Sequence, residues 1–545
     1  MGRRGSFSET FFPCLPSTPA LHLCSRSLQN RRLKMARSVS RGRKPTAAAA
    51  KKAAEASANK KNGKPSSTKA ASSKAAVAAA AAESSGFSVS SLFLPVFVGA
   101  VAVYQGLQGV MPPRSDIPSH LLHHPVEYTH NLISEDTGTA LKALVHEMAV
   151  FPSNIAADLK TGGFKVRHPH IGEAEPTIAV TDSAGNVTYK CEHELMVPNA
   201  DRTLCYLPQR VDVGKHFIYS GGVDGQRESF QSSIQRVTSF GRYYMGKEAL
   251  DTRLPDLVKN LFQEPKFLDA AKRICPKDKQ ELDPFQFNVI MQIPGQTVAS
   301  HIDAPYFWGA DRLDFPQWLL AVMVFSNLFS EKFIDQVQVV GYLSDISPKL
   351  GATEEDIAGI GGEFIYYQDN DEGRYTKESA IYLAGSCVDG SKLVHASRIY
   401  KPGVQVPKMD KDKNSELVYV GSDKWEVRVE DEVVATYPDS DLRVSIVYRA
   451  RCFADAAELT KYQNYKELQG EDHMSLDFVL KTLVDNMVAK GAAVASDISM
   501  PRVDLAMKLM GFYIKYPWPS VDESPHMPYN YCLLSKKFGF LPEIC

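Results

Sequence analysis

Two histidines and one aspartate in the chain have the types and spacing of a metal site. His301 and Asp303 are two residues apart after a Pro-Gly turn, so in strand geometry their side chains point to the same side. His395, in an apolar run, is the third candidate. Two imidazoles and one carboxylate form the facial triad that holds non-haem Fe(II) and leaves coordination positions open. We therefore expect His301, Asp303 and His395 to bind one iron ion.

An arginine and a serine late in the chain have the spacing of an anion site. Arg443 and Ser445 are also two residues apart, so they share one side of a strand. If 2-oxoglutarate chelates the iron, its distal carboxylate needs a bidentate cation, which Arg provides better than Lys. We expect Arg443 to bind that carboxylate with Ser445 beside it. Two alternatives stay open: Arg443 pairs with a core carboxylate, or Arg398 or Arg449 is the anion anchor.

Short apolar runs with turn residues between them dominate the region that carries these candidates. Their length and β-branched content predict strands, and their number is typical of a barrel or sandwich. The runs are 285–293, 336–343, 363–367, 380–385, 392–397, 417–421, 425–429 and 442–450. The expected fold class is α+β, with a strand-rich core and flanking helices.

Four motifs of this region, in sequence order, resemble those of the 2-oxoglutarate/Fe(II)-dependent oxygenases, most nearly the prolyl 4-hydroxylase-like group. They are Gly295-Gln296 ahead of His301-Ile302-Asp303, then Gly361-Gly362-Glu363-Phe364, then Lys392-Leu393-Val394-His395, then Arg443-Val444-Ser445-Ile446. The resemblance covers residues 286–453. It implies a double-stranded β-helix (jelly roll) with iron on His301, Asp303 and His395, and 2-oxoglutarate on Arg443 and Ser445. It also implies O2 as a co-substrate and oxidative decarboxylation of 2-oxoglutarate to succinate.

Three features depart from the pattern of that group. Val298 stands three places before the first histidine, where the prolyl hydroxylases usually have an aromatic residue. Arg443 follows His395 by 48 residues, a longer interval than in that group, with a hairpin at 417–429 between them. The insert 304–336 carries aromatic residues that are more typical of a core, although a substrate mouth is the alternative. These aromatic residues are Tyr306, Phe307, Trp308, Phe315 and Trp318.

The charged residues are divided unevenly along the chain. The sequence has 62 Lys and Arg against 63 Asp and Glu, but 17 of the former and 3 of the latter precede residue 114. The head is therefore strongly basic and the remainder acidic. Ala, Lys and Ser dominate 36–85, and such a composition cannot offset the entropy of ordering. We expect residues 1–86 to form a disordered basic tail.

An uncharged run separates this tail from the acidic body. Its apolar centre, 92–107, predicts a single transmembrane signal anchor over 87–111. The positive-inside rule then places the tail in the cytosol and the body in the lumen of the endoplasmic reticulum or Golgi. One alternative is an apolar helix that packs on the body. Another is a plastid or other organelle transit peptide, because residues 1–45 are rich in Arg and Ser.

Both flanks of the predicted core have mixed or helical patterns. Residues 114–285 predict an α+β flanking region, with a helix at 139–150 and extended runs at 177–180 and 216–219. Residues 454–545 predict a helical C-terminal extension. Cys191 and Cys205 bracket a hairpin-like segment. A disulfide in an oxidising lumen and two buried thiols are equally compatible with that spacing.

Together these patterns predict an Fe(II)- and 2-oxoglutarate-dependent dioxygenase. The first hypothesis is a membrane-anchored hydroxylase of a peptidyl, prolyl-type substrate. The alternatives are an oxygenase of a small molecule or lipid, and a non-catalytic jelly-roll binding protein. The expected partners are the substrate and, through residues 87–111, a membrane; no nucleic acid is expected.

Overall fold

The computed structural model of the chain describes most of the acidic body. The described residues are 116–154, 175–181, 183–185, 187–192, 195–198, 202–344, 353, 359–370, 375–409, 413–468, 473–517, 530 and 532. All of them belong to one compact unit, Phe87–Cys545. The predicted tail (1–86) and signal anchor (87–111) lie outside the described residues. Within the described ranges, no helix has the length and apolar character needed to cross a membrane.

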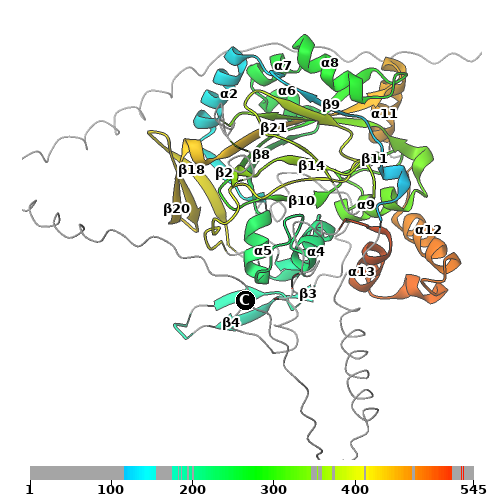
Figure 1. The fold of residues 1–545 in the computed structure, drawn as a ribbon. Coiled ribbons are helices and arrows are strands. Elements are labelled where there is room, and N and C mark those ends of the chain that lie inside the picture. The colour runs from blue at the N-terminus through cyan, green and yellow to red at the C-terminus, as the bar shows by residue number, and fades with distance from the viewer. Residues whose placement is uncertain are drawn as a thin grey trace, which may run out of the picture. The chain divides into compact units, whose positions relative to one another are not determined.

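Two antiparallel sheets form the centre of the body (Figure 1). The larger has the strand order β1, β16, β13, β21, β9, β8, and the smaller has the order β10, β17, β14, β15. The bounds are Val126–Thr129 (β1), Gly385–Val388 (β16), Gln336–Tyr342 (β13), Arg443–Phe453 (β21), Glu281–Gln292 (β9), Phe240–Met245 (β8), Val298–His301 (β10), His395–Ser397 (β17), Phe364–Tyr366 (β14) and Thr376–Glu378 (β15).

The strands pair in a nested order. β9 pairs with β21, β10 with β17, β13 with β16, and β14 with β15, each pair antiparallel. Among these eight strands, the first therefore pairs with the last, the second with the seventh, the third with the sixth and the fourth with the fifth. This nested pairing is the strand order of a jelly roll wound across two sheets. The mixed helix and strand architecture thus has the core that the sequence resemblance implies.

The outer face of the larger sheet is covered by helices. Ile446, Tyr448 and Ala450 of β21 point to this side and are buried in one apolar cluster. The same cluster includes residues from four helices, which Figure 1 shows above this sheet. These helices are α2 (Glu135–Met148), α6 (Lys247–Arg253), α7 (Asp256–Leu261) and α8 (Pro265–Ile274). Burial of this face fixes which residues of β21 point the other way.

The opposite face of β21 looks into the space between the two sheets. Val447 packs there with Tyr342 of β13 and Phe364 of β14, in a cluster that joins both sheets. Because strand side chains alternate, Arg443 and Ser445 point into the same interior. The two predicted co-substrate ligands therefore lie inside the jelly roll.

The region before the core contributes to the larger sheet as well as flanking it. β1 and β8 are the two edge strands of that sheet, and both come from residues 114–285. The predicted extended run at 216–219 is wrong, since it lies in helix α4 (Val211–Ser220). The four residues 216–219 are mostly aromatic or β-branched, and so short a run does not distinguish a strand from part of a helix.

One further strand prediction is wrong, and two predicted strands lie outside the jelly roll. The run 380–385 predicts a strand, but Leu383 has a φ of 64° in a turn and β16 begins at Gly385. The runs 417–421 and 425–429 belong to a separate four-stranded sheet. Its strands, in order, are β2 (Val150–Pro152), β18 (Ser415–Gly421), β19 (Lys424–Val429) and β20 (Glu432–Pro438).

A second apolar cluster joins the insert after the metal ligands to the C-terminal helices. Helix α9 (Gln317–Ser326) is apolar all round, and Trp318 through Phe325 are buried. It packs with α12 (Leu476–Ala489) and α13 (Arg502–Tyr513). Four of the five aromatic residues singled out in the insert are buried in apolar clusters, and Trp308 is partly buried against one. They are core residues.

The remaining elements are short or peripheral. They are α5 (Phe230–Val237), α11 (Ala456–Leu468), β3 (Glu175–Pro176), β4 (Ile178–Thr181), β5 (Val187–Lys190), β6 (Val197–Pro198), β7 (Leu204–Tyr206), β11 (Tyr306–Phe307) and β12 (Phe333–Ile334). Cys191 and Cys205, left open by the sequence, form a disulfide beside this small β region. A second disulfide joins Cys275 to Cys452.

Candidate metal centre

The three predicted metal ligands meet at one end of the smaller sheet. His301 is the last residue of β10, and His395, the first residue of β17, lies opposite it in the ladder. Asp303 lies two residues after His301. One of its carboxylate oxygens is 3.8 Å from His301 Nε2, and the other is 3.9 Å from His395 Nε2. All three ligand atoms lie within 4.8 Å of one another. One ion can therefore contact all three.

Backbone carbonyl groups orient both imidazoles. His301 Nδ1 lies 2.7 Å from Ala299 O, and His395 Nδ1 lies 2.8 Å from Leu393 O. An Nδ1 proton donated to a carbonyl leaves the Nε2 lone pair for a metal ion. Burial lowers the pKa of both histidines, and in His301 the neighbouring His395 lowers it further. Both rings are therefore neutral near pH 7, which is the form that binds metals.

The carboxylate of Asp303 is 13% exposed and ionised. Burial by itself raises the pKa of Asp303, but Arg449, followed by the two histidines, lowers it to about 2. Arg449 Nη1 lies 3.8 Å from Asp303 Oδ1. Asp303 Oδ2 is buried without a hydrogen-bond partner. A buried, ionised oxygen with no donor fits a divalent cation as its partner.

A glycine behind Asp303 makes room for its carboxylate. The Asp303 backbone N–H donates to Gly390 O at 2.7 Å. A Cβ atom at Gly390 would stand 2.1 Å from Asp303 Oδ2 and 3.1 Å from His395 Cε1. Any side chain at this position would displace the ligands. Gly390 therefore belongs to the site, although the sequence signals only a turn there.

Arg443 lies on the inner face of β21 and has only neutral hydrogen-bond acceptors. Its Nε donates to Gly362 O at 3.1 Å and its Nη1 donates to Gln292 Oε1 at 2.6 Å. Burial lowers the pKa of Arg443, and the nearby Tyr342, Tyr400 and Glu363, in that order, act against this. No carboxylate of the described residues forms an ion pair with this guanidinium. A buried cation without an acid fits an anionic ligand as its partner.

The two alternative anion anchors are already paired. Arg398 Nη2 lies 2.8 Å from Asp224 Oδ1, and Arg449 contacts the ligand Asp303. Ser445 is buried on the same side of β21 as Arg443. The structure thus places Arg443 and Ser445 together and leaves Arg443 as the cation without an acid among the three arginines.

Two further residues near the ligands had no motif to identify them. Gln338 of β13 places its side-chain Nε2 3.3 Å from His395 Nε2. Its sequence signal is a polar residue at an inward position of a Val-rich strand. Arg210, which precedes α4, adds positive charge that lowers the pKa of all three ligands. No sequence pattern marks Arg210, because its place near the site depends on how α4 packs.

Strand order and ligand geometry together define a jelly-roll protein with a two-histidine, one-carboxylate centre. No family model and no curated protein matches the chain. Similar solved structures include a prolyl-4-hydroxylase from Pseudomonas putida, 10% identical with a TM-score of 0.22 over 60% of this chain and 92% of that chain. They also include a viral collagen prolyl hydroxylase from Paramecium bursaria Chlorella virus-1, 14% identical with a TM-score of 0.20 over 39% and 79%. A 2OG-Fe(II) oxygenase family oxidoreductase from Burkholderia pseudomallei is 13% identical, with a TM-score of 0.20 over 39% and 68%.

Proposed function

We propose that the protein is an Fe(II)- and 2-oxoglutarate-dependent dioxygenase that hydroxylates a C–H bond. One observation carries this proposal: the triad of buried His301 and His395 with the partly buried Asp303 shares the jelly-roll interior with a buried Arg443 that forms no ion pair with an acid among the described residues. A structural metal site would need a fourth protein ligand and would have no use for an unpaired guanidinium. A site for a chelating dianion needs open metal positions and an unpaired cation, and this site offers three protein ligands and Arg443.

Each residue has a defined task in this proposal. Bound Fe(II), with 2-oxoglutarate and O2, supplies the oxidative decarboxylation to succinate and the hydroxylation. His301, Asp303 and His395 would hold the ion through three positions. Arg443 would bind the distal carboxylate of 2-oxoglutarate, with the Ser445 hydroxyl beside it, and so orient the keto-acid end toward the triad. Burial of these side chains keeps water from competing for the same positions.

Turnover and metal content together test the reaction class. We expect the wild type to bind iron and to form succinate from 2-oxoglutarate. The His301→Ala variant should lose both the bound iron and the succinate formation. The non-catalytic alternative predicts no difference between the two proteins. His473→Ala, which changes a histidine of the C-terminal region, is the matched control and should behave as the wild type.

For the substrate, the proposal follows the motif resemblance to the prolyl 4-hydroxylase-like group and names a peptidyl, prolyl-type residue. A small molecule or lipid is the second candidate. Succinate formation measured with proline-rich peptides and with a metabolite and lipid panel separates them. Stimulation by peptides alone supports the first candidate, and stimulation by metabolites or lipids alone contradicts it.

We further propose that the chain is anchored through residues 87–111 with its body in the secretory lumen. Two disulfides, Cys191–Cys205 and Cys275–Cys452, support an oxidising compartment for the body. Alkaline carbonate extraction of membranes should leave the full chain in the pellet and release a truncated chain that starts at Arg114. Release of the full chain would contradict the anchor.

A further inference from the structure

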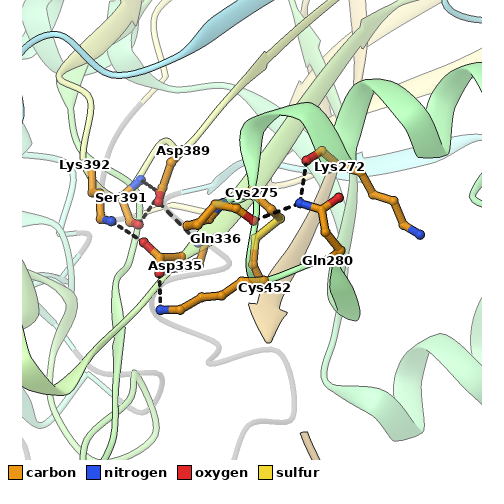
Figure 2. Close-up of a disulfide and its surroundings, with 11 residues drawn as sticks. Lys272, Cys275, Gln280, Asp335, Gln336, Asp389, Ser391, Lys392 and Cys452 are labelled. Atoms are coloured by element: carbon orange, nitrogen blue, oxygen red, sulfur yellow. Dashed lines mark hydrogen bonds and ion pairs between the residues drawn. A yellow bond between two sulfur atoms is a disulfide. The ribbon is translucent and has the colours of Figure 1, made fainter. Parts of the chain in front are cut away.

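A buried acid at the start of β13 joins two lysines from distant parts of the chain. Asp335 accepts a hydrogen bond from Lys279 Nζ at 2.5 Å and a second, short one from Lys392 Nζ. Its side chain is 11% exposed, while the lysines are 31% and 28% exposed. Figure 2 shows Asp335 beside Lys392, next to the Cys275–Cys452 disulfide. A bridge this well buried restricts both lysines.

One side of the bridge is fixed by the disulfide. The backbone N–H of Cys452 donates to Asp335 O at 2.8 Å. Cys452 is bonded to Cys275, which directly follows helix α8. Lys279 lies four residues after Cys275, so the disulfide holds both Asp335 and one of its lysines. This side of the bridge is part of a cross-linked frame.

The other side of the bridge reaches the turn between β16 and β17. Lys392 ends that turn, and Asp389 begins it. The Asp389 carboxylate accepts hydrogen bonds from Ser391 Oγ at 2.5 Å, Ser391 N at 3.1 Å and Gln336 N at 3.2 Å. Gln336 is the neighbour of Asp335. The turn is therefore attached to the start of β13 at two points.

The same turn carries the contact with the metal ligand. Gly390, at its centre, accepts the hydrogen bond from the Asp303 backbone and packs against the Asp303 carboxylate. His395, the first residue of β17, comes three residues after Lys392. A displacement of the turn therefore moves one ligand and the surface against which another rests.

We propose that the Lys279–Asp335–Lys392 bridge is a positioning device for the metal centre, which transmits the rigidity of the Cys275–Cys452 disulfide to Asp303. The inference rests on the proposed metal site. Asp335 touches neither metal nor substrate in this scheme, and it acts through the turn that carries Gly390. Removal of a group that is hydrogen-bonded directly to a metal ligand alters metal affinity by roughly 10-fold to 100-fold, and Asp335 acts one contact further out, so the lower end of this range applies.

Metal affinity of the full chain, measured with Mn(II) by the loss of the free-ion EPR signal, tests the proposal. We expect Asp335→Asn to weaken Mn(II) binding about 10-fold or more. The matched control is Asp497→Asn, because Asp497 is 14% exposed and pairs with Lys508 at 2.5 Å, in the C-terminal region. This control should bind Mn(II) within threefold of the wild type. Melting temperatures of both variants show whether the fold is retained.

A Mn(II) affinity of Asp335→Asn within threefold of the control overturns the positioning role. If Asp335→Asn does not fold, Lys392→Met replaces it, since this variant leaves the Lys279 pair in place, and the same threshold decides. Absence of Mn(II) binding in the wild type is a different result, and it overturns the proposed function itself.

The contribution of the disulfide is measured in the same assay. The Cys275→Ala, Cys452→Ala pair should weaken Mn(II) binding, whereas the Cys191→Ala, Cys205→Ala pair should not. Equal effects of the two pairs would contradict transmission through the bridge. The Co(II) absorption spectrum of each protein reports the coordination geometry independently of any turnover.

Discussion

At the scale of single residues, Arg443 and Arg449 of β21 differ in what neutralises their charge. Arg449 lies beside Asp303 and stabilises the ionised form of its carboxylate, so Asp303 balances the charge of Arg449. Arg443 has a carbonyl and an amide oxygen as acceptors. A buried guanidinium without an acid lowers stability unless a ligand supplies the missing charge. The cost is consistent with a residue kept for binding.

We expect Arg443→Ala to raise the KM for 2-oxoglutarate by about 100-fold, since it removes charge-assisted hydrogen bonds worth roughly 1.5–3 kcal/mol each. Arg443→Lys should raise it about tenfold, because the charge stays but the bidentate geometry is lost. Succinate formation against 2-oxoglutarate concentration measures both. Arg398→Lys, at the arginine that pairs with Asp224, is the control and should leave this KM unchanged.

At the scale of elements, the C-terminal segment packs against the helix that precedes the core. Tyr516, just after α13, donates its hydroxyl to Asp212 Oδ2 of α4 at 2.6 Å, and both side chains are buried. Burial raises the pKa of Asp212, whereas the hydrogen bond from Tyr516 lowers it. The contact connects residues 304 positions apart. The C-terminal region is therefore part of the body that surrounds the ligand-bearing strands.

Tyr516→Phe should lower the free energy of unfolding by about 1–3 kcal/mol, because it removes a donor from a buried acid. Tyr513→Phe is the matched control, since its hydroxyl binds only the neutral acceptors Leu483 O and Asn486 Oδ1. We expect a smaller loss there, about 0.5–1.5 kcal/mol. Urea unfolding of both variants measures the difference, and equal losses would contradict a special role for the Asp212 contact.

At the scale of the whole molecule, the Cys191–Cys205 and Cys275–Cys452 disulfides close very different lengths of chain. Cys191 and Cys205 are 14 residues apart, whereas Cys275 and Cys452 are 177 apart and enclose most of the jelly roll. In the chain-entropy model, the stabilisation by a disulfide rises with the length of the loop that it closes. The longer cross-link should therefore stabilise the body more.

We expect the Cys275→Ala, Cys452→Ala pair to lower stability by about 5 kcal/mol, and the Cys191→Ala, Cys205→Ala pair by about 3 kcal/mol. Calorimetric melting of the oxidised proteins gives both values. A larger loss for the shorter loop would show that local packing, and not chain entropy, determines the effect.

The sequence determined much of the site because strand geometry is local. A period of two places Arg443 with Ser445 on one side of β21, whereas Asp303 lies two residues beyond the end of β10 and is held by its backbone hydrogen bond to Gly390 O. The order of the motifs in the sequence predicted the jelly roll, but it did not predict the edge strands of the larger sheet. β1 and β8 join the sheet from the flank, and the 380–385 run lies before its strand. Strand ends depend on the partner strand, which local sequence does not contain.

Only the tertiary structure decided how these residues are partnered. The β10 and β17 ladder sets His395 opposite His301, and packing assigns Asp224 to Arg398 and Asp303 to Arg449. The pairing of Cys275 with Cys452 and the bridge at Asp335 were equally beyond the sequence. Each of these contacts joins residues far apart in the chain. Their energies depend on distance in space and on burial, and the folded chain alone fixes both.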